Sequence, residues 1–264
     1  MTKSIALCAD DYAQHPGIDQ AVCALLALGR LSAVSCLSEA PRWASHGAPR
    51  LREFDGADVG LHLNLTERFG PPQASLAALI AASYLRRLDT GALRQRLERQ
   101  FDAFEAGLGR APDFVDGHQH VHQLPQVREL VLDLLAQRYG ARLPWVRNTV
   151  PAPGTTGAKP ALLRLLGGAA LAVRLRQAGI GSNRGFGGVY GFAGDDYAAR
   201  FAHWLARAGQ AGLLMCHPGA TLDAFDPISA QRLVEYRFLC SDAFPALLAA
   251  HHTRLASMTS MLPA

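Results

Sequence analysis

Short apolar segments typical of buried β-strands alternate along this chain with longer segments that have helical periodicity. A strand that is apolar throughout is buried on both faces, and alternation of such strands with helices predicts a parallel sheet, either open or closed into a barrel. We therefore predict an α/β fold. The expected strands span residues 4–9, 33–37, 59–65, 114–118, 145–147, 213–216 and 254–256, and the expected helices span 16–29, 76–88, 91–107, 125–140, 160–178, 195–211 and 229–250, the last with a break at Pro245.

The chain has 264 residues, of which 49% are hydrophobic and 18% are charged. A disordered chain is excluded by this composition, and a substantial buried core is expected. Single-domain α/β barrels reach about 250 residues, and neither a linker nor an internal repeat divides this sequence. We expect residues 1–264 to form one domain.

Charge and hydropathy exclude several classes of partner. The 26 basic and 22 acidic side chains leave a net charge of +4, which is too small and too dispersed to predict nucleic-acid binding. We see no signal peptide, and no uninterrupted apolar stretch reaches the ~18 residues that a membrane span needs. The five cysteines are odd in number and lie in apolar runs, which predicts buried reduced thiols and a cytoplasmic protein. The sequence leaves open whether the chain forms a homodimer.

Polar side chains gather where the predicted strands end. Asp10-Asp11, His62 with Asn64, the segment 116–122 and His217 each follow or end a different apolar strand. The carboxyl ends of parallel strands form one edge of a sheet, where sites are assembled from several strands. Each motif alone also has a structural interpretation: a turn or helix cap at Asp10-Asp11, a hydrogen-bonded core histidine at His62, and a Pro-Gly turn after His217.

The segment 116–122, with sequence Asp-Gly-His-Gln-His-Val-His, is the densest of these motifs. If it stays extended, period two places Asp116, His118, His120 and His122 on one side. Burying four ionisable groups together is costly unless a metal ion or water compensates them; the alternative is an exposed loop.

His217 suits a general acid with a pKa near neutral. The glycines of 183–188 lack the order of a phosphate-binding loop, and we expect a mobile loop there.

Taken together and in this order, Asp10-Asp11, the segments 60–64 and 116–122, and Cys216-His217-Pro218-Gly219 resemble the YdjC-like (ChbG/HpnK-type) carbohydrate deacetylase family. This resemblance implies a distorted (β/α) TIM-like barrel related to polysaccharide deacetylases. It also implies metal-dependent removal of an acetyl group from an N-acetylated sugar, either a chitooligosaccharide-like saccharide or a cell-envelope glycan precursor. Gly117 departs from the family pattern, which usually has Ser there, and this bears on which sugar is used.

The resemblance also assigns roles by position. It makes Asp11, His62 and His118 the ligands of one divalent cation, Mg²⁺ or Zn²⁺, with Asp10 as general base and His217 as general acid. Imidazole ligands by themselves favour Zn²⁺, Co²⁺ or Fe²⁺ over Mg²⁺. The residues that we expect to line the sugar site are Asn64, His120, His122 and Arg147.

The chemistry of deacetylation needs these groups. Water must attack an amide carbonyl, and the departing amine must be protonated; a cation activates the water, Asp10 takes its proton and His217 supplies one to the nitrogen. Two other functions remain open on the same residues. One is a metal-dependent phosphoesterase or cyclic amidohydrolase, because such enzymes share Asp/His ligand sets. The other is a non-catalytic carbohydrate-binding protein on the same scaffold.

Overall fold

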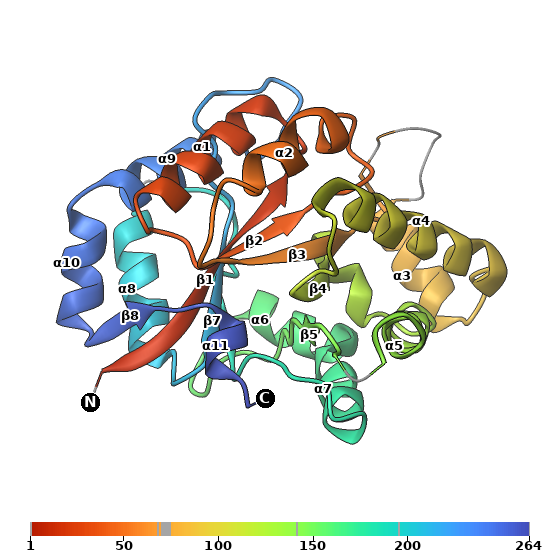
Figure 1. Cartoon of the computed structure of the whole chain (residues 1–264). Helices are drawn as coiled ribbons and strands as arrows, with labels where there is room; N and C mark the ends of the chain where they lie inside the picture. The colour runs from red at the N-terminus through yellow and green to blue at the C-terminus, as the bar shows by residue number, and fades with distance from the viewer. Residues whose placement is uncertain (1, 68, 70–74, 141, 195, 264) are drawn as a thin grey trace.

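A parallel β-sheet lies at the centre of the computed structural model, with helices arranged around it (Figure 1). The structure describes residues 2–67, 69, 75–140, 142–194 and 196–263. The strands within this part of the chain are β1 (Lys3–Tyr12), β2 (Ala33–Cys36), β3 (Asp58–Leu63), β4 (Phe114–Gly117), β5 (Trp145–Val146), β6 (Phe186–Gly187), β7 (Gly212–Cys216) and β8 (Thr253–Leu255).

The helices cover the outer face of the sheet. Among the described residues, no helix combines the length and the apolar character that crossing a membrane requires. The α-helices are α1 (Pro16–Ala27), α2 (Ala48–Leu51), α3 (Leu76–Tyr84), α4 (Thr90–Leu108), α5 (Val127–Tyr139), α6 (Ala158–Leu163), α7 (Ala169–Gln177), α8 (Tyr197–Arg207), α9 (Ser229–Cys240), α10 (Ala243–Ala250) and α11 (Met258–Met261); η1 (Trp43–Gly47) and η3 (Arg164–Gly168) are π-helical, and η2 (His118–Gln123) is a 3₁₀ segment.

The sheet curls into an incomplete barrel. Its strands run in the order β5-β4-β3-β2-β1-β7-β6, each pair parallel, and β8 pairs with the first residues of β1. Pro151, just after β5, forms a parallel bridge with Phe186 of β6, so the two ends of the sheet approach each other. The predicted α/β fold with a distorted barrel is confirmed.

Alternating residues of each strand pack on opposite faces of the sheet. In β1, Ile5, Leu7 and Ala9 belong to the large core between sheet and helices, whereas Ala6 and Cys8 belong to a smaller cluster inside the barrel. That inner cluster is aromatic where β4 and β5 meet: Phe114 and Trp145 stack with ring centroids 4.2 Å apart. A Cβ on Gly60 of β3 would lie 2.4 Å from the Phe114 ring, so this close approach requires glycine.

An extra residue interrupts the alternation near the end of β1. Ala9 pairs with Val34 and Tyr12 with Cys36, so three steps along β1 match two along β2. Asp11 takes up the extra residue with φ of 66°, a left-handed conformation that aspartate tolerates better than most residues. Without it, Asp11 would follow Leu7 and Ala9 toward the helices; with it, Asp10 and Asp11 are both buried at the barrel interior.

The structure corrects several local predictions. The segment 116–122 does not stay extended, because Gln119 and His120 have φ of 52° and 60° and the chain turns into η2. The break in the last helical region falls between Cys240 and Ala243, and Pro245 lies inside α10. The glycine-rich segment 183–188 is not a free loop, because it contains β6, which pairs with β7.

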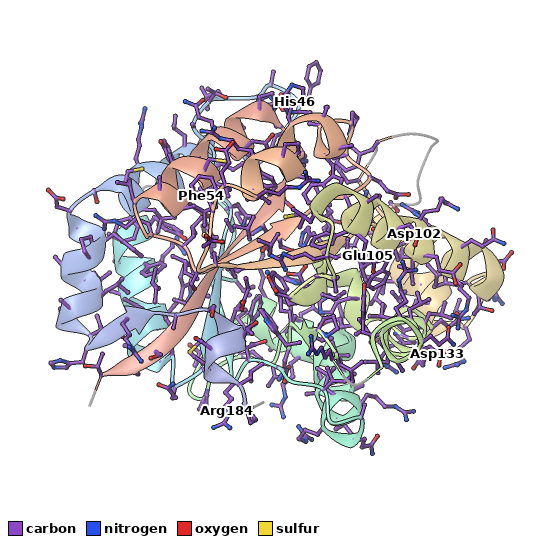
Figure 2. The ribbon with its side chains drawn as sticks, in the orientation of Figure 1. His46, Phe54, Asp102, Glu105, Asp133 and Arg184 are labelled. Carbon is purple, nitrogen blue, oxygen red and sulfur yellow. The ribbon has the colours of Figure 1, made fainter. Side chains whose placement is uncertain are left out.

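Charged side chains occupy the outer faces of the helices on the α4 and α5 side. Asp102 and Glu105 project from α4, and Asp133 projects from α5, as Figure 2 shows. Arg138 of α5 forms ion pairs with both Asp102 and Glu105, joining the two helices across their surface. These pairs are exposed or half-buried, and pairs of this kind contribute about 0–1 kcal/mol each.

Candidate active site

One layer of polar side chains closes the barrel interior at the carboxyl ends of five neighbouring strands. Asp10, Ser35, His62 and Asp116 come from β1 to β4, and Arg147 directly follows β5. Each stands at an inward-facing position of its strand. This is the next inward-facing position toward the carboxyl end after the apolar inner cluster. All five are at most 2% exposed. Period two therefore explains why the layer forms.

Arg147 neutralises two carboxylates of this layer. Its guanidinium donates to both oxygens of Asp10 at 2.6 Å and lies 2.6 Å from Oδ2 of Asp116. Burial alone would raise the pKa of Asp10, but the charge and hydrogen bonds of Arg147 hold that pKa well below its usual range. Cys8, Asp10 and Asp116 offer atoms within 4.8 Å of one another, yet the guanidinium contacts all three. We therefore interpret this group as an arginine site and not a metal site.

His62 is oriented by its neighbours in the layer. Its Nδ1 lies 2.6 Å from Oδ1 of Asp116 and 2.8 Å from Oγ of Ser35, while Nε2 faces Asp11 Oδ1 at 3.3 Å. Because the Asp116 carboxylate only accepts, Nδ1 carries a proton and Nε2 is left for the Asp11 side. Burial lowers the pKa of His62, but Asp116 and the other nearby carboxylates raise it overall, to about 10. At this pKa the metal-free imidazole also carries a proton on Nε2 at pH 7, and a cation bound at Nε2 would displace that second proton and leave the one on Nδ1.

Asp11, His62 and His118 form a group whose ligand atoms all lie within 4.8 Å of one another. His118 Nδ1 lies 2.8 Å from Asp11 Oδ1, and the two imidazole rings meet edge to face with centroids 5.6 Å apart. One carboxylate with two imidazoles is a donor set suited to a divalent cation, and it leaves further coordination positions for water or substrate. The carboxylate behind His62 is the arrangement that commonly orients a metal-bound histidine. The donor set therefore fits a metal.

The second oxygen of Asp11 is held from the opposite side. Arg232 of α9 donates to Asp11 Oδ2 at 2.7 Å, and its Nε donates to Asp226 at 2.5 Å. Burial would raise the pKa of Asp11, but Arg232 and His118 hold it well below the usual range. Asp11 is thus a carboxylate, with Oδ2 fixed and Oδ1 turned toward the two imidazoles.

His217 sits beside Asp10 at the end of β7. Its Nε2 lies 3.9 Å from Asp10 Oδ2, and its ring packs edge-on against Phe192 with centroids 5.0 Å apart. Burial lowers the pKa of His217 to about 4, which outweighs the nearby carboxylates. The expectation of a near-neutral pKa was therefore wrong for this structure, because His217 is only 9% exposed. His217 is neutral at pH 7.

The four residues expected to line a sugar site lie in different surroundings. Asn64 shapes the turn after β3: its Oδ1 accepts the N–H groups of Thr66 and Glu67. His122 is 1% exposed and bonds through Nε2 to the carbonyl oxygen of Arg147, which is itself fully buried. His120 is only partly buried and packs edge-on against Phe186. Direct contact with a sugar stays a prediction for all four. Burial favours supporting roles for His122 and Arg147, and the less buried His120 is better placed than these two to contact a sugar.

Sequence reasoning named Asp116 only as one of four ionisable groups in its segment, and it missed Ser35, Arg232 and Glu235, the last of which accepts the N–H of His217. Ser35 and Asp116 orient His62, and the period-two pattern of their strands already points them inward. Arg232 and Glu235 come from α9, far from the other motifs in the sequence. No local pattern connects a helix face to a strand end, so only the tertiary structure reveals them.

Comparison with known proteins identifies the family of this chain. A family model described as YdjC-like protein matches residues 4–250. A chitooligosaccharide deacetylase from Serratia marcescens is 30% identical over 267 residues, covering 94% of this chain and 95% of that protein. A human carbohydrate deacetylase is 31% identical over 153 residues. The match to the human protein covers 52% of this chain and 46% of that protein, so the chain spans about half the length of this relative.

Solved structures show the same fold at lower identity. An Enterococcus faecalis protein described as a proposed cellobiose-phosphate cleavage protein superposes with a TM-score of 0.75, at 17% identity and full coverage of both chains. A peptidoglycan N-acetylglucosamine deacetylase superposes with a TM-score of 0.52, at 13% identity, over 98% of this chain and 87% of that one. The motifs, the incomplete barrel and the match over residues 4–250 lead to one conclusion: this chain belongs to the YdjC-like protein family.

Proposed function

We propose that this protein is a metal-dependent deacetylase that removes the acetyl group from an N-acetylated saccharide. The observation that supports it most directly is the group Asp11, His62 and His118, whose ligand atoms lie within 4.8 Å of one another. Beside it, Asp10 and His217 stand 3.9 Å apart. The deacetylase relatives, one of them matching along nearly the whole chain, support a chitooligosaccharide-like substrate. We further propose that residues 1–264 act as one domain, since a single sheet supplies every strand of the site.

In this proposal Asp11, His62 and His118 hold one divalent cation, Zn²⁺ or Mg²⁺. When bound, the cation supplies Lewis acidity that polarises the acetyl carbonyl and lowers the pKa of water from ~15.7 toward ~7. Two imidazoles among three protein ligands favour Zn²⁺ over Mg²⁺. Asp116 keeps the proton of His62 on Nδ1, so that Nε2 is the ligand atom.

Asp10 and His217 move the protons. Arg147 keeps Asp10 ionised and fixes both of its oxygens, so Asp10 is a positioned base of low intrinsic strength. His217 is neutral before the reaction and must gain a proton before it can donate one to the departing amine. The Asp10 oxygen 3.9 Å from Nε2 is the source that we propose. The proton then passes from water to Asp10, to His217 and to the nitrogen.

Acetate release tests this function. The purified protein is stripped with a chelator, reloaded with Zn²⁺ or Mg²⁺, and incubated with N-acetylated chitooligosaccharides of two to four sugars. We expect acetate release that depends on metal and is lost in His118→Ala. His46→Ala is the matched control, since His46 is an exposed residue of η1, an element that supplies none of the site residues named above. A His118→Ala variant as active as the parent would overturn the proposal.

The same preparation separates the alternatives. Phosphate released from sugar phosphates, and lost in Asp11→Asn, would replace the deacetylase proposal with a phosphoesterase. Saccharide binding with no turnover under either metal would indicate a binding protein. The intact pair of Asp10 and His217 argues against the last outcome, since binding alone needs neither a clamped carboxylate nor an adjacent imidazole.

A further inference from the structure

Two buried side chains of α9 bond to two different parts of the candidate active site. Arg232 and Glu235 are three residues apart, so they lie on the same face of the helix, one turn apart. Arg232 is 3% exposed and bonds to Asp11; Glu235 is fully buried and bonds to the main chain of His217. We propose that Arg232 and Glu235 are positioning residues, through which α9 sets the metal ligand and the proton donor relative to each other. The inference rests on the function proposed above.

Arg232 fixes the direction of the Asp11 carboxylate. Its guanidinium spans two acids, with one nitrogen 2.7 Å from Asp11 Oδ2 and Nε 2.5 Å from Asp226 Oδ2. Asp226 in turn accepts the N–H of Ile228 at 3.0 Å, which ties the fork to the start of α9. A planar fork held at both ends restricts rotation of Asp11, whereas a lysine ammonium would act as a point charge. Oδ1 therefore stays directed at His62 and His118.

The helix holds the turn that carries His217 at two places. The His217 N–H donates to Glu235 Oε2 at 2.6 Å, and the Gly219 N–H donates to the carbonyl oxygen of Arg232 at 3.1 Å. A Cβ on Gly219 would lie 3.0 Å from Cβ of Arg232, so the turn packs directly on the helix. This is where β7 has ended and sheet pairing no longer constrains the chain.

The Glu235 carboxylate is itself fixed. Tyr190 donates a hydrogen bond to Oε1 and Tyr197 donates one to Oε2 at 3.3 Å. Tyr190 also packs against Phe192, whose ring contacts the His217 imidazole. Both the backbone and the ring of His217 are therefore positioned by the same cluster. A displacement of about 1 Å in a catalytic group can cost about 10²-fold in rate, so this placement matters for turnover.

The Arg232 half of the proposal is tested by metal binding, which needs no substrate. Co²⁺ is titrated into the metal-free parent, Arg232→Lys and the exposed control Arg237→Lys, with the visible absorption of Co²⁺ as readout. Arg232→Lys keeps the charge and loses the fork, so we expect its affinity to fall by about 10- to 100-fold, as when other partners of metal ligands are removed. The control should match the parent. Unchanged or tighter binding by Arg232→Lys would overturn a positioning role.

Asp226→Asn provides a second variant in case Arg232→Lys does not fold. It keeps the shape of Asp226 and the whole Arg232 side chain, but weakens the hydrogen bond that Asp226 accepts from Arg232 Nε. We expect a smaller loss of Co²⁺ affinity in the same direction. If Asp226→Asn binds Co²⁺ as tightly as the parent does, the guanidinium of Arg232 does not orient Asp11 in the way proposed.

The Glu235 half is tested by a conservative rescue. Glu235→Leu removes the acceptor for the His217 N–H, while Glu235→Gln retains one. We expect Glu235→Leu to lower kcat for acetate release by about 10²-fold with KM little changed, and Glu235→Gln to restore most of it. Equal losses in the two variants would overturn the proposal.

Histidine NMR separates failure of this inference from failure of the proposed function. The imidazole resonances of His217, assigned with His217→Gln, should shift in Glu235→Leu and stay near their parent positions in Glu235→Gln. If no sugar releases acetate, the NMR and Co²⁺ results still decide whether α9 positions Asp11 and His217. Unmoved His217 resonances in Glu235→Leu would refute the role of Glu235 regardless of substrate.

Discussion

Glu235 should make the stability of this protein depend on pH in a direction opposite to that of most carboxylates. Its side chain is fully buried, and burial raises its pKa to about 7, although Tyr190, the His217 N–H and Arg232 partly oppose the rise. In the unfolded chain the usual value of 4.5 applies. At about 1.4 kcal/mol per pKa unit, the difference corresponds to about 3 kcal/mol.

The sign follows from proton counting. Between pH 4.5 and about 7 the folded protein keeps a proton on Glu235 that the unfolded chain has released. The free energy of unfolding therefore falls as pH rises through this window, by up to about 3 kcal/mol from this group, and becomes level above it. The contribution is fully present below pH 4.5.

The assay is urea denaturation of metal-free protein from pH 4.5 to 8, with the parent compared to Glu235→Gln. Other titrating groups are shared by the two proteins, so their difference isolates Glu235. We expect the stability of the parent relative to the variant to fall by about 3 kcal/mol across the window. The exposed Glu53→Gln serves as the matched control for the loss of one carboxyl group. Parallel curves for parent and Glu235→Gln would refute the reasoning.

Three further predictions concern the polar layer and the sheet beneath it. Arg147→Met should cost about 3–5 kcal/mol in urea denaturation, because it leaves buried carboxylates uncompensated, and the additional substitution Asp116→Asn should recover part of that loss. Asp116→Asn alone should lower metal affinity about 10- to 100-fold in calorimetric titration, because it no longer fixes the proton of His62; unchanged affinity would contradict this. Gly60→Ala should lower thermal stability by about 1–3 kcal/mol, because its Cβ would lie 2.4 Å from the Phe114 ring; a variant that melts with the parent would contradict the packing argument.

The sequence was sufficient for the fold because the strands are encoded locally. Strands such as 59–65 combine branched apolar residues at one parity with small or polar residues at the other, and this pattern alone identifies the face that meets the helices. The same parity places His62 and Asp116 side by side in adjacent strands, as the register confirms. Where a residue's direction depends on strand periodicity, the sequence predicted it.

The prediction failed where the backbone leaves that periodicity. The left-handed residues Gln119 and His120 turn the chain, so His118, His120 and His122 point to three different environments and not to one. Burial of His217 is set by elements distant in sequence, so its low pKa could not be predicted from its position at a strand end. Contacts made by α9 are likewise invisible in a linear pattern.

The additional residue in β1 makes the site sensitive to the length of this strand. Two adjacent carboxylates face the same cavity only because the strand is one residue longer than its neighbour there. Deletion of one residue at this point would restore even pairing and leave one acid where the proposed function uses two. A protein with such a deletion should keep the barrel and lose the activity proposed here.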